Sequence, residues 1–128
     1  IYLKNLKNRG IMKLVNLSDK DLVNFYIKGN ELALEELVNR HKTRIYSYIL
    51  ITIKNKALAE DFFQDTFVKV IKTLKSGKYN EEGKFLPWVM RIAHNLMIDH
   101  FRKQKKFRKV SSRGRDREEI DIFNTIGY

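Results

Sequence analysis

The 128-residue sequence contains no cysteine, a single proline and only six glycines. The lack of cysteine excludes a disulfide scaffold, a thiolate metal site and a cysteine nucleophile. The scarcity of proline and glycine argues against a turn-rich β-sandwich and favours long helices. No apolar run approaches the roughly 20 residues that span a bilayer, and no signal peptide is evident. We therefore expect a cytoplasmic protein without a membrane partner.

Acidic residues are also fewer than basic ones. The sequence has 15 Asp and Glu and 26 Lys and Arg, which gives a net charge of +11. The excess is concentrated in residues 84–109, where eight basic residues accompany one acid, Asp99. Such a local field indicates a polyanionic partner, and nucleic acid fits better than an anionic membrane. The simpler alternative is a solvated basic helix end that binds nothing.

Hydrophobic residues recur at steps of three and four and predict helices over residues 19–28, 31–52, 56–75 and 85–107. Ser18, Asn30 and Asn55 are candidate N-caps, and Pro87 fits the first turn of the last helix. The β-branched stretch 49–53 also resembles a strand, but the continuous apolar stripe favours helix. The fold class is therefore all-α, a compact bundle of three long helices plus one short N-terminal helix.

Three segments are expected along the chain. Residues 1–17 have no clear period and are interpreted as a leader. Residues 18–109 hold the helical domain. Residues 110–128 begin with a linker-like composition and are interpreted as a linker or tail.

The helix over 56–75 carries a polar face opposite its apolar side. Asp61, Gln64 and Asp65 share this face at spacings of three and four, and Val68 and Lys72 continue it. An acidic face on a basic protein suits docking to a protein partner, although an ordinary solvated face has the same pattern. Two carboxylates at this spacing also suit a divalent metal, but no histidine joins them, so we expect no metal and no cofactor.

The helix over 85–107 carries the second candidate surface. A polar stripe about four turns long follows its length and comprises Arg91, Asn95, Asp99, Arg102 and Lys106. Arginine and lysine suit phosphates, and an asparagine amide can read a base edge. Lys103 adds to the cations, and aromatic residues interleave with them as in proteins that bind nucleic acid.

The loop 78–84 places Tyr79, Asn80 and Lys84 between the two long helices. It could form a pocket for an unstacked base, or it could be an ordinary connection. Trp88 at the helix start is interpreted as core, with direct DNA contact as the alternative. Nucleophilic triads, Walker loops and dinucleotide fingerprints are absent from the sequence, so we expect no enzyme activity.

Two stretches resemble a known family. Residues 59–70, AEDFFQDTFVKV, are similar to the "AED-x-x-Q-[ED]-T-F" signature in the second region of bacterial sigma factors. Residues 85–102, FLPWVMRIAHNLMIDHFR, resemble their promoter-reading segment, often written F-x-x-W-L-x-x-I-A-x-N-x-x-I-D-x-x-R. The resemblance covers roughly residues 18–109, and its compact form points to the extracytoplasmic-function group.

The resemblance implies a function in transcription initiation. Asp61, Gln64 and Asp65 would face the coiled coil of the largest subunit of core RNA polymerase. The stripe from Arg91 to Lys106 would engage the minus-ten promoter element. The loop around Tyr79 and Asn80 would hold the flipped base of the melted non-template strand. Asp99 matches the family motif but is interpreted as a helix-packing or ion-pair residue.

The resemblance also implies an anti-sigma factor as a partner. A full family member carries a second DNA-binding domain for the minus-thirty-five element, and residues 110–128 are too few to hold one, so we expect a fragment or a shortened relative. The competing hypothesis is a self-sufficient basic helical DNA-binding regulator. Such a protein would bind duplex DNA alone and would not need the acidic face.

Overall fold

The computed structural model describes residues 14–80 and 82–111. Within these ranges it contains four helices, which pack on one another, and no strand. The helices are α2 (Asp19–Ile27), α3 (Glu31–Ile53), α4 (Lys56–Lys75) and α5 (Phe85–Ser111). This confirms the all-α prediction, and the helix bounds agree with the expected ones within one residue except at the end of α5. That helix runs four residues beyond the expected Phe107.

The helix starts follow from capping side chains. The Ser18 hydroxyl accepts a hydrogen bond from the backbone N–H of Asp21, and the amide oxygens of Asn30 and Asn55 cap α3 and α4 in the same way. Each cap satisfies a backbone N–H that has no partner within the helix. The stretch 49–53 is helical, with Ile49 fully buried and Ile51 72% exposed.

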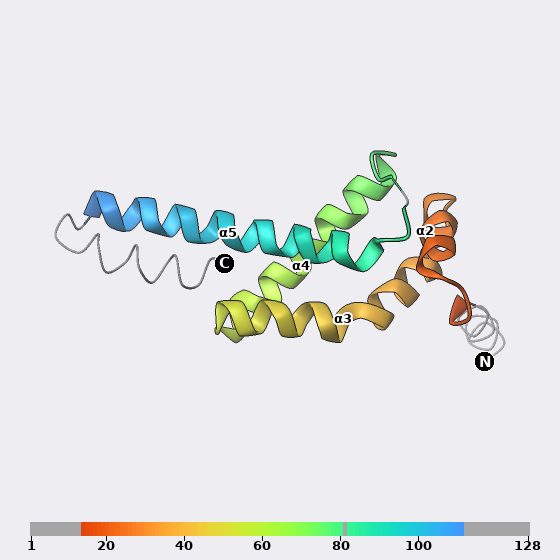
Figure 1. Ribbon diagram of the computed structural model, residues 1–128, viewed down its shortest axis with the longest axis horizontal. Coiled ribbons are helices and arrows are strands. Elements are labelled where there is room, and N and C mark those ends of the chain that lie inside the picture. Colours follow the sequence, from red (N-terminus) through yellow and green to blue (C-terminus); the bar gives the residue numbers. More distant parts are fainter. Residues whose placement is uncertain (1–13, 81, 112–128) are drawn as a thin grey trace.

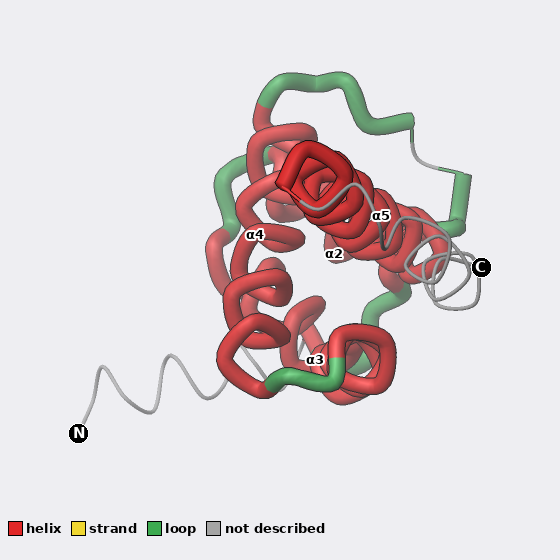
Figure 2. The backbone as a smooth tube through the Cα atoms, turned by 90° about the vertical axis from the view of Figure 1, so that its left-hand side faces the viewer, coloured by secondary structure: helices red, strands yellow, loops and turns green. Residues whose placement is uncertain are grey.

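The three long helices pack around one hydrophobic core. In Figure 1, α3 and α5 run across the view while α4 rises obliquely from the end of α3 and passes behind α5, and α2 lies against the start of α3. Figure 2 shows α3, α4 and α5 surrounding the interior of the bundle. All three long helices and α2 contribute fully buried side chains, among them Leu22, Leu37, Ile49, Leu74 and Val89.

Hydrogen bonds from one arginine tie the segment before α2 to the bundle. Arg40 of α3 donates to the backbone oxygens of Leu17, at 2.8 Å, and Val15, at 3.3 Å. Leu14 is buried in the core. Residues 14–17 of the expected leader therefore pack on the domain, whereas residues 1–13 lie outside the described part of the chain. Of the expected tail, residues 110 and 111 belong to α5 and residues 112–128 also lie outside the described part.

Beyond its first four turns, α5 extends past the other helices, at the left of Figure 1. The last α5 residues that pack on the cluster of buried side chains are Met97 and the partly buried Phe101. From Arg102 onward the described side chains are exposed, apart from the half-buried Lys105. The fold thus presents the most basic stretch of the sequence as a projecting helix.

Candidate functional site

The polar stripe of α5 faces solvent along its whole length. Arg91, Asn95, Asp99, Arg102 and Lys106 are all exposed, as is Lys103 beside them. The opposite face of the helix buries Val89, Ala93 and Met97. The hydrophobic pattern alone thus predicted correctly which side of α5 is exposed to solvent. Because these side chains are exposed, the stripe is available to an external ligand.

Asp99 forms a weak ion pair within this stripe. Its Oδ1 atom lies 4.0 Å from Nη1 of Arg102, and both side chains are more than 60% exposed. This arrangement agrees with the interpretation of Asp99 as an ion-pair residue and not with a role in helix packing. An exposed pair at this distance contributes little to stability. Arg102 therefore stays free to exchange Asp99 for a phosphate.

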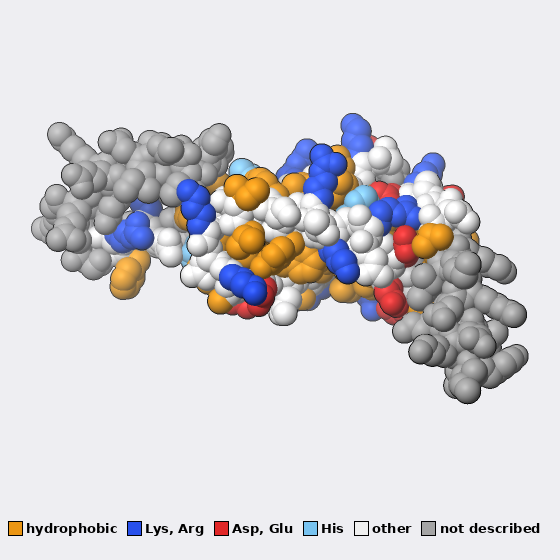
Figure 3. All heavy atoms as spheres, turned by 90° about the horizontal axis from the view of Figure 1, so that it is seen from below, with side chains coloured by type: hydrophobic (Ala, Val, Ile, Leu, Met, Phe, Trp, Pro, Cys, Tyr) orange, Lys and Arg blue, Asp and Glu red, His pale blue; other side chains and the backbone are white. Residues whose placement is uncertain are grey.

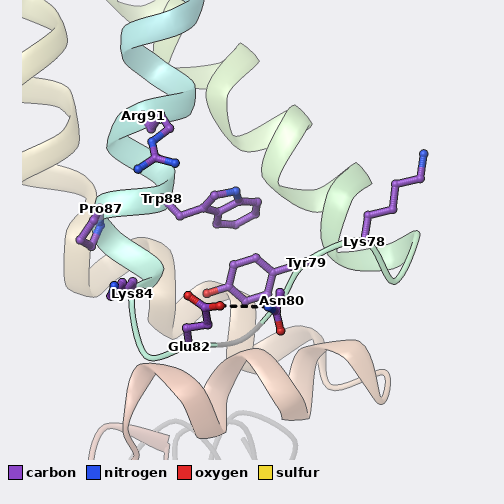
Figure 4. A pocket seen from close by; sticks show the side chains of 8 residues that line it. All are labelled: Lys78, Tyr79, Asn80, Glu82, Lys84, Pro87, Trp88 and Arg91. Atoms are coloured by element: carbon purple, nitrogen blue, oxygen red, sulfur yellow. Dashed lines mark hydrogen bonds between the residues drawn. The ribbon is translucent and has the colours of Figure 1, made fainter.

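A pocket of about 310 Å³ lies where the α4–α5 loop meets the first turns of α5 (Figure 4). We call it the loop pocket, and its lining comprises Lys78, Tyr79, Asn80, Glu82, Lys84, Pro87, Trp88 and Arg91. Four of the predicted site residues, Tyr79, Asn80, Lys84 and Arg91, are brought together here. Arg91 also begins the stripe, so the pocket and the stripe form one continuous surface.

Two aromatic rings form one wall of the loop pocket. The ring centroids of Tyr79 and Trp88 are 4.3 Å apart with planes tilted by 46°, and Figure 4 shows them side by side. Trp88 also packs against the buried Phe85 and is itself only partly buried. It is therefore both a core residue and a pocket residue.

The loop pocket also contains Lys78, Glu82 and Pro87, which the sequence did not predict as site residues, and Trp88, for which DNA contact was only the alternative. A signal for Trp88 was available, because a residue three positions before Arg91 shares its helical face. Glu82 gave no such signal, since it lies in a loop without a period. In the structure its Oε1 atom accepts a hydrogen bond of 3.0 Å from Nδ2 of Asn80.

The second candidate surface is the outer face of α4. Asp61, Gln64, Asp65 and Lys72 are exposed on it, and Val68 among them is 48% exposed. The opposite side of the helix buries Phe67, Val70 and Leu74. We call these five exposed residues the α4 face. It has one apolar side chain within a polar, acidic surround, an arrangement that suits a protein contact.

A shallow apolar groove lies between α3 and α4. It has a volume of about 290 Å³ and is lined by Lys42, Thr43, Tyr46, Ser47 and Phe63. The Phe63 ring packs edge-on against Tyr46, with the centroids 6.0 Å apart. Figure 3 views the molecule from the α3 side and shows hydrophobic side chains gathered in the middle of that face, with Lys and Arg around them.

The histidines are engaged in structural contacts. Nε2 of His41 lies 2.8 Å from Oδ2 of Asp19, and Nδ1 of His94 lies 2.8 Å from the Tyr48 hydroxyl. Burial raises the pKa of that Tyr48 hydroxyl above its ordinary value. His100 packs edge-on against Phe62 of α4. Within residues 14–80 and 82–111, no group of three acidic or histidine side chains is placed to hold a metal ion.

None of the helices in the described ranges is both long and apolar enough to cross a membrane.

Comparison with known proteins gives one matching family, sigma-70 region 2, over residues 37–107. This segment includes most of α3, all of α4 and most of α5. No solved structure matches the chain significantly.

Several curated sigma factors are similar to the chain. RNA polymerase sigma factor CarQ of Myxococcus xanthus is 38% identical over 85 residues, which are 66% of this chain and 48% of CarQ. ECF RNA polymerase sigma factors SigW and SigM of Bacillus subtilis are 36% and 32% identical over 78 and 75 residues. Those matches cover 61% and 59% of this chain, and 41% and 44% of SigW and SigM.

The chain thus spans about half the length of the curated relatives that it matches. The family match covers more than half of the chain and contains both candidate surfaces, the α4 face and the α5 stripe with its loop pocket. Together, the all-helical fold, the family match and the similarity to ECF sigma factors give one conclusion. The chain belongs to the sigma-70 region 2 family, in the extracytoplasmic-function group of RNA polymerase sigma factors.

Proposed function

We propose that this chain is the part of a sigma factor that binds core RNA polymerase and recognises and melts the minus-ten promoter element. The observation that carries the proposal is the continuity of the loop pocket with the α5 stripe through Arg91. A site for a base and a track for a phosphate backbone then lie side by side. This role requires binding energy and no catalytic group, so the proposed function is not enzymatic.

Melting is driven by differential binding to the opened strand. Extruding a base from a duplex costs a few kcal/mol, and the cost is offset when a pocket holds the extruded base. In the loop pocket, the aromatic wall of Tyr79 and Trp88 offers stacking surface, which is worth about 1–3 kcal/mol per base. Lys78, Lys84 and Arg91 attract the neighbouring phosphates.

The α5 stripe fixes the position of the strand. Arg102, Lys103 and Lys106 are exposed and carry the charge that binds phosphates without regard to sequence. Asn95 lies one turn from Arg91 on the same face, so its amide is the candidate for reading a base edge. Phosphate contacts position the strand, and base contacts give the specificity.

Polymerase docking is assigned to the α4 face. Asp61, Gln64, Asp65, Val68 and Lys72 would contact the coiled coil of the largest polymerase subunit. The support is the half-exposed Val68, which supplies apolar area within a polar rim. An anti-sigma factor is a further proposed partner, and the cytoplasm is the proposed compartment because polymerase and promoter DNA are there.

The alternative is a basic helical regulator that binds duplex DNA by itself. The two functions are separated by testing open-complex formation and duplex binding with and without core polymerase. We expect weak binding of the isolated chain to duplex DNA and open complexes only when polymerase is present. Tight duplex binding without polymerase, together with no affinity for polymerase, would favour the regulator instead.

A further inference from the structure

Helix α2 carries none of the residues assigned to DNA or to polymerase, and it lies before the segment 37–107 that matches the family. Its Leu22, Val23 and Tyr26 side chains are buried, and the helix packs on α3 and, less extensively, on α4. Any effect of α2 on the loop pocket therefore passes through side chains that lie between the two.

The Asp19 carboxylate connects α2 to two consecutive residues of α3. Oδ1 accepts a hydrogen bond of 3.0 Å from Nη1 of Arg40, and Oδ2 lies 2.8 Å from Nε2 of His41. Because an ionised carboxylate only accepts hydrogen bonds, His41 donates through its Nε2–H. Rotation of a histidine ring about its Cβ–Cγ bond has only broad preferences. The hydrogen bond to Asp19 thus fixes the orientation in which the His41 ring meets its neighbours.

The oriented His41 ring packs against the first residue of α5. Its centroid lies 5.9 Å from that of Phe85, with the planes tilted by 40°. Phe85 is only 1% exposed, and its ring centroid lies 6.0 Å from that of Trp88. Trp88 forms the aromatic wall of the loop pocket together with Tyr79. A series of direct contacts therefore leads from Asp19 to this wall.

A second contact joins α2 to the other end of the loop. Nζ of Lys75, the last residue of α4, lies 5.9 Å from the centre of the Tyr26 ring. Tyr26 is buried, and a cation over an aromatic ring is an attractive arrangement. Helix α2 thus touches the end of α4 directly and the start of α5 through His41. Figure 4 shows the loop spanning these two ends, with α2 below it in that view.

We propose that His41 is a positioning residue for the loop pocket, held by Asp19 of α2 and acting through Phe85 on the aromatic wall. Helix α2 is then the support that keeps Trp88 and Tyr79 in the arrangement in which a base can stack on them. The effect of this arrangement on DNA rests on the proposed function of the loop pocket. The inference adds a residue outside the pocket lining, and a helix outside the family match, to the parts that melting requires.

Trp88 is the only tryptophan of the chain, so its fluorescence reports on the pocket wall without a label. Acrylamide quenching of Trp88 is measured in the full chain, well below the melting temperature, for the wild type, Asp19→Ala, His41→Ala and the double variant. Both single variants should raise the quenching constant, because a wall that is no longer held exposes the indole more often. The double variant should match His41→Ala, since Asp19 acts through the ring that this variant lacks.

The same variants are then assembled with core polymerase, and the affinity of each holoenzyme for DNA with a pre-melted bubble is measured. Each single variant should bind about fivefold more weakly, near the low end of what one stacked base contributes. Action through one pathway predicts about fivefold for the double variant too, whereas independent effects would multiply to about 25-fold. Trp88→Ala, which removes the wall itself, should weaken bubble binding at least as much.

Ile49→Val is the matched control, because it removes one buried methylene group from α3 at about 12 Å along the helix from His41. It should lower the melting temperature and yet keep the wild-type quenching constant and bubble affinity. The positioning role would be overturned by wild-type quenching in both Asp19→Ala and His41→Ala, by effects that multiply in the double variant, or by an equal change in Ile49→Val. Changed quenching with wild-type bubble affinity in every variant, Trp88→Ala included, would support the positioning role and overturn the proposed function of the loop pocket.

Discussion

The cations of the α5 stripe should set the salt dependence of DNA binding, and two of them allow a quantitative test. Arg91 lies at the loop pocket, whereas Lys106 lies on the projecting end of the helix, and both are exposed. Replacing either by Ala removes one positive charge and leaves the core untouched. Thermal stability should therefore stay close to that of the wild type.

The expected change in the salt dependence of binding follows from counterion release. Each phosphate neutralised on a single strand contributes about 0.7 to the slope of log affinity against log salt. If Arg91, Arg102, Lys103 and Lys106 each contact one phosphate, the slope from this face is about −2.8. Losing one contact flattens it by about 0.7, so the advantage of the wild type over the variant shrinks roughly 2.6-fold when salt rises fourfold.

Fluorescence anisotropy with holoenzyme and a labelled melted-strand oligonucleotide, repeated over a salt series, gives both slopes. Lys20→Ala is the control, since Lys20 is an exposed cation on α2, and it should leave the slope unchanged. The reasoning is refuted if Arg91→Ala and Lys106→Ala both keep the wild-type slope. A flattened slope in Lys20→Ala would show that charge anywhere on the protein has the same effect.

Three further outcomes are expected. The double substitution Gln64→Ala and Asp65→Ala should weaken binding to core polymerase at unchanged melting temperature, and wild-type affinity in a pull-down would contradict the assignment of the α4 face. Asn95→Ala should relax the ranking of minus-ten variants in open-complex assays more than it lowers total affinity, whereas an unchanged ranking would place base reading elsewhere. Asp19→Ala should lower the free energy of unfolding by about 1–2 kcal/mol in urea titrations, because it removes the contacts of 3.0 Å to Arg40 and 2.8 Å to His41. An unaltered urea midpoint would show that these contacts contribute nothing.

The sequence by itself determined the helices and which of their faces are exposed or buried. Capping by Ser18, Asn30 and Asn55 involves a backbone N–H two or three residues away, so its signal is local. The exposed faces of α4 and α5 follow from the period of 3.6 residues, which places residues three and four apart on one side. The family motifs lie on the same two helices and therefore could be recognised from the sequence as well. The end of α5 was less well determined, because terminal turns carry weak sequence signals.

Contacts between elements were decided only by the tertiary structure. Asp19 meets Arg40 and His41 across more than twenty residues of sequence, and no period predicts which side chains of two helices will touch. The loop pocket is of the same kind. The approach of Tyr79 to Trp88 depends on how the loop leaves α4 and on where the first turn of α5 packs in the core. Helical periodicity fixes directions around one axis, whereas a pocket requires the relative placement of several segments, and packing of the whole bundle sets that placement.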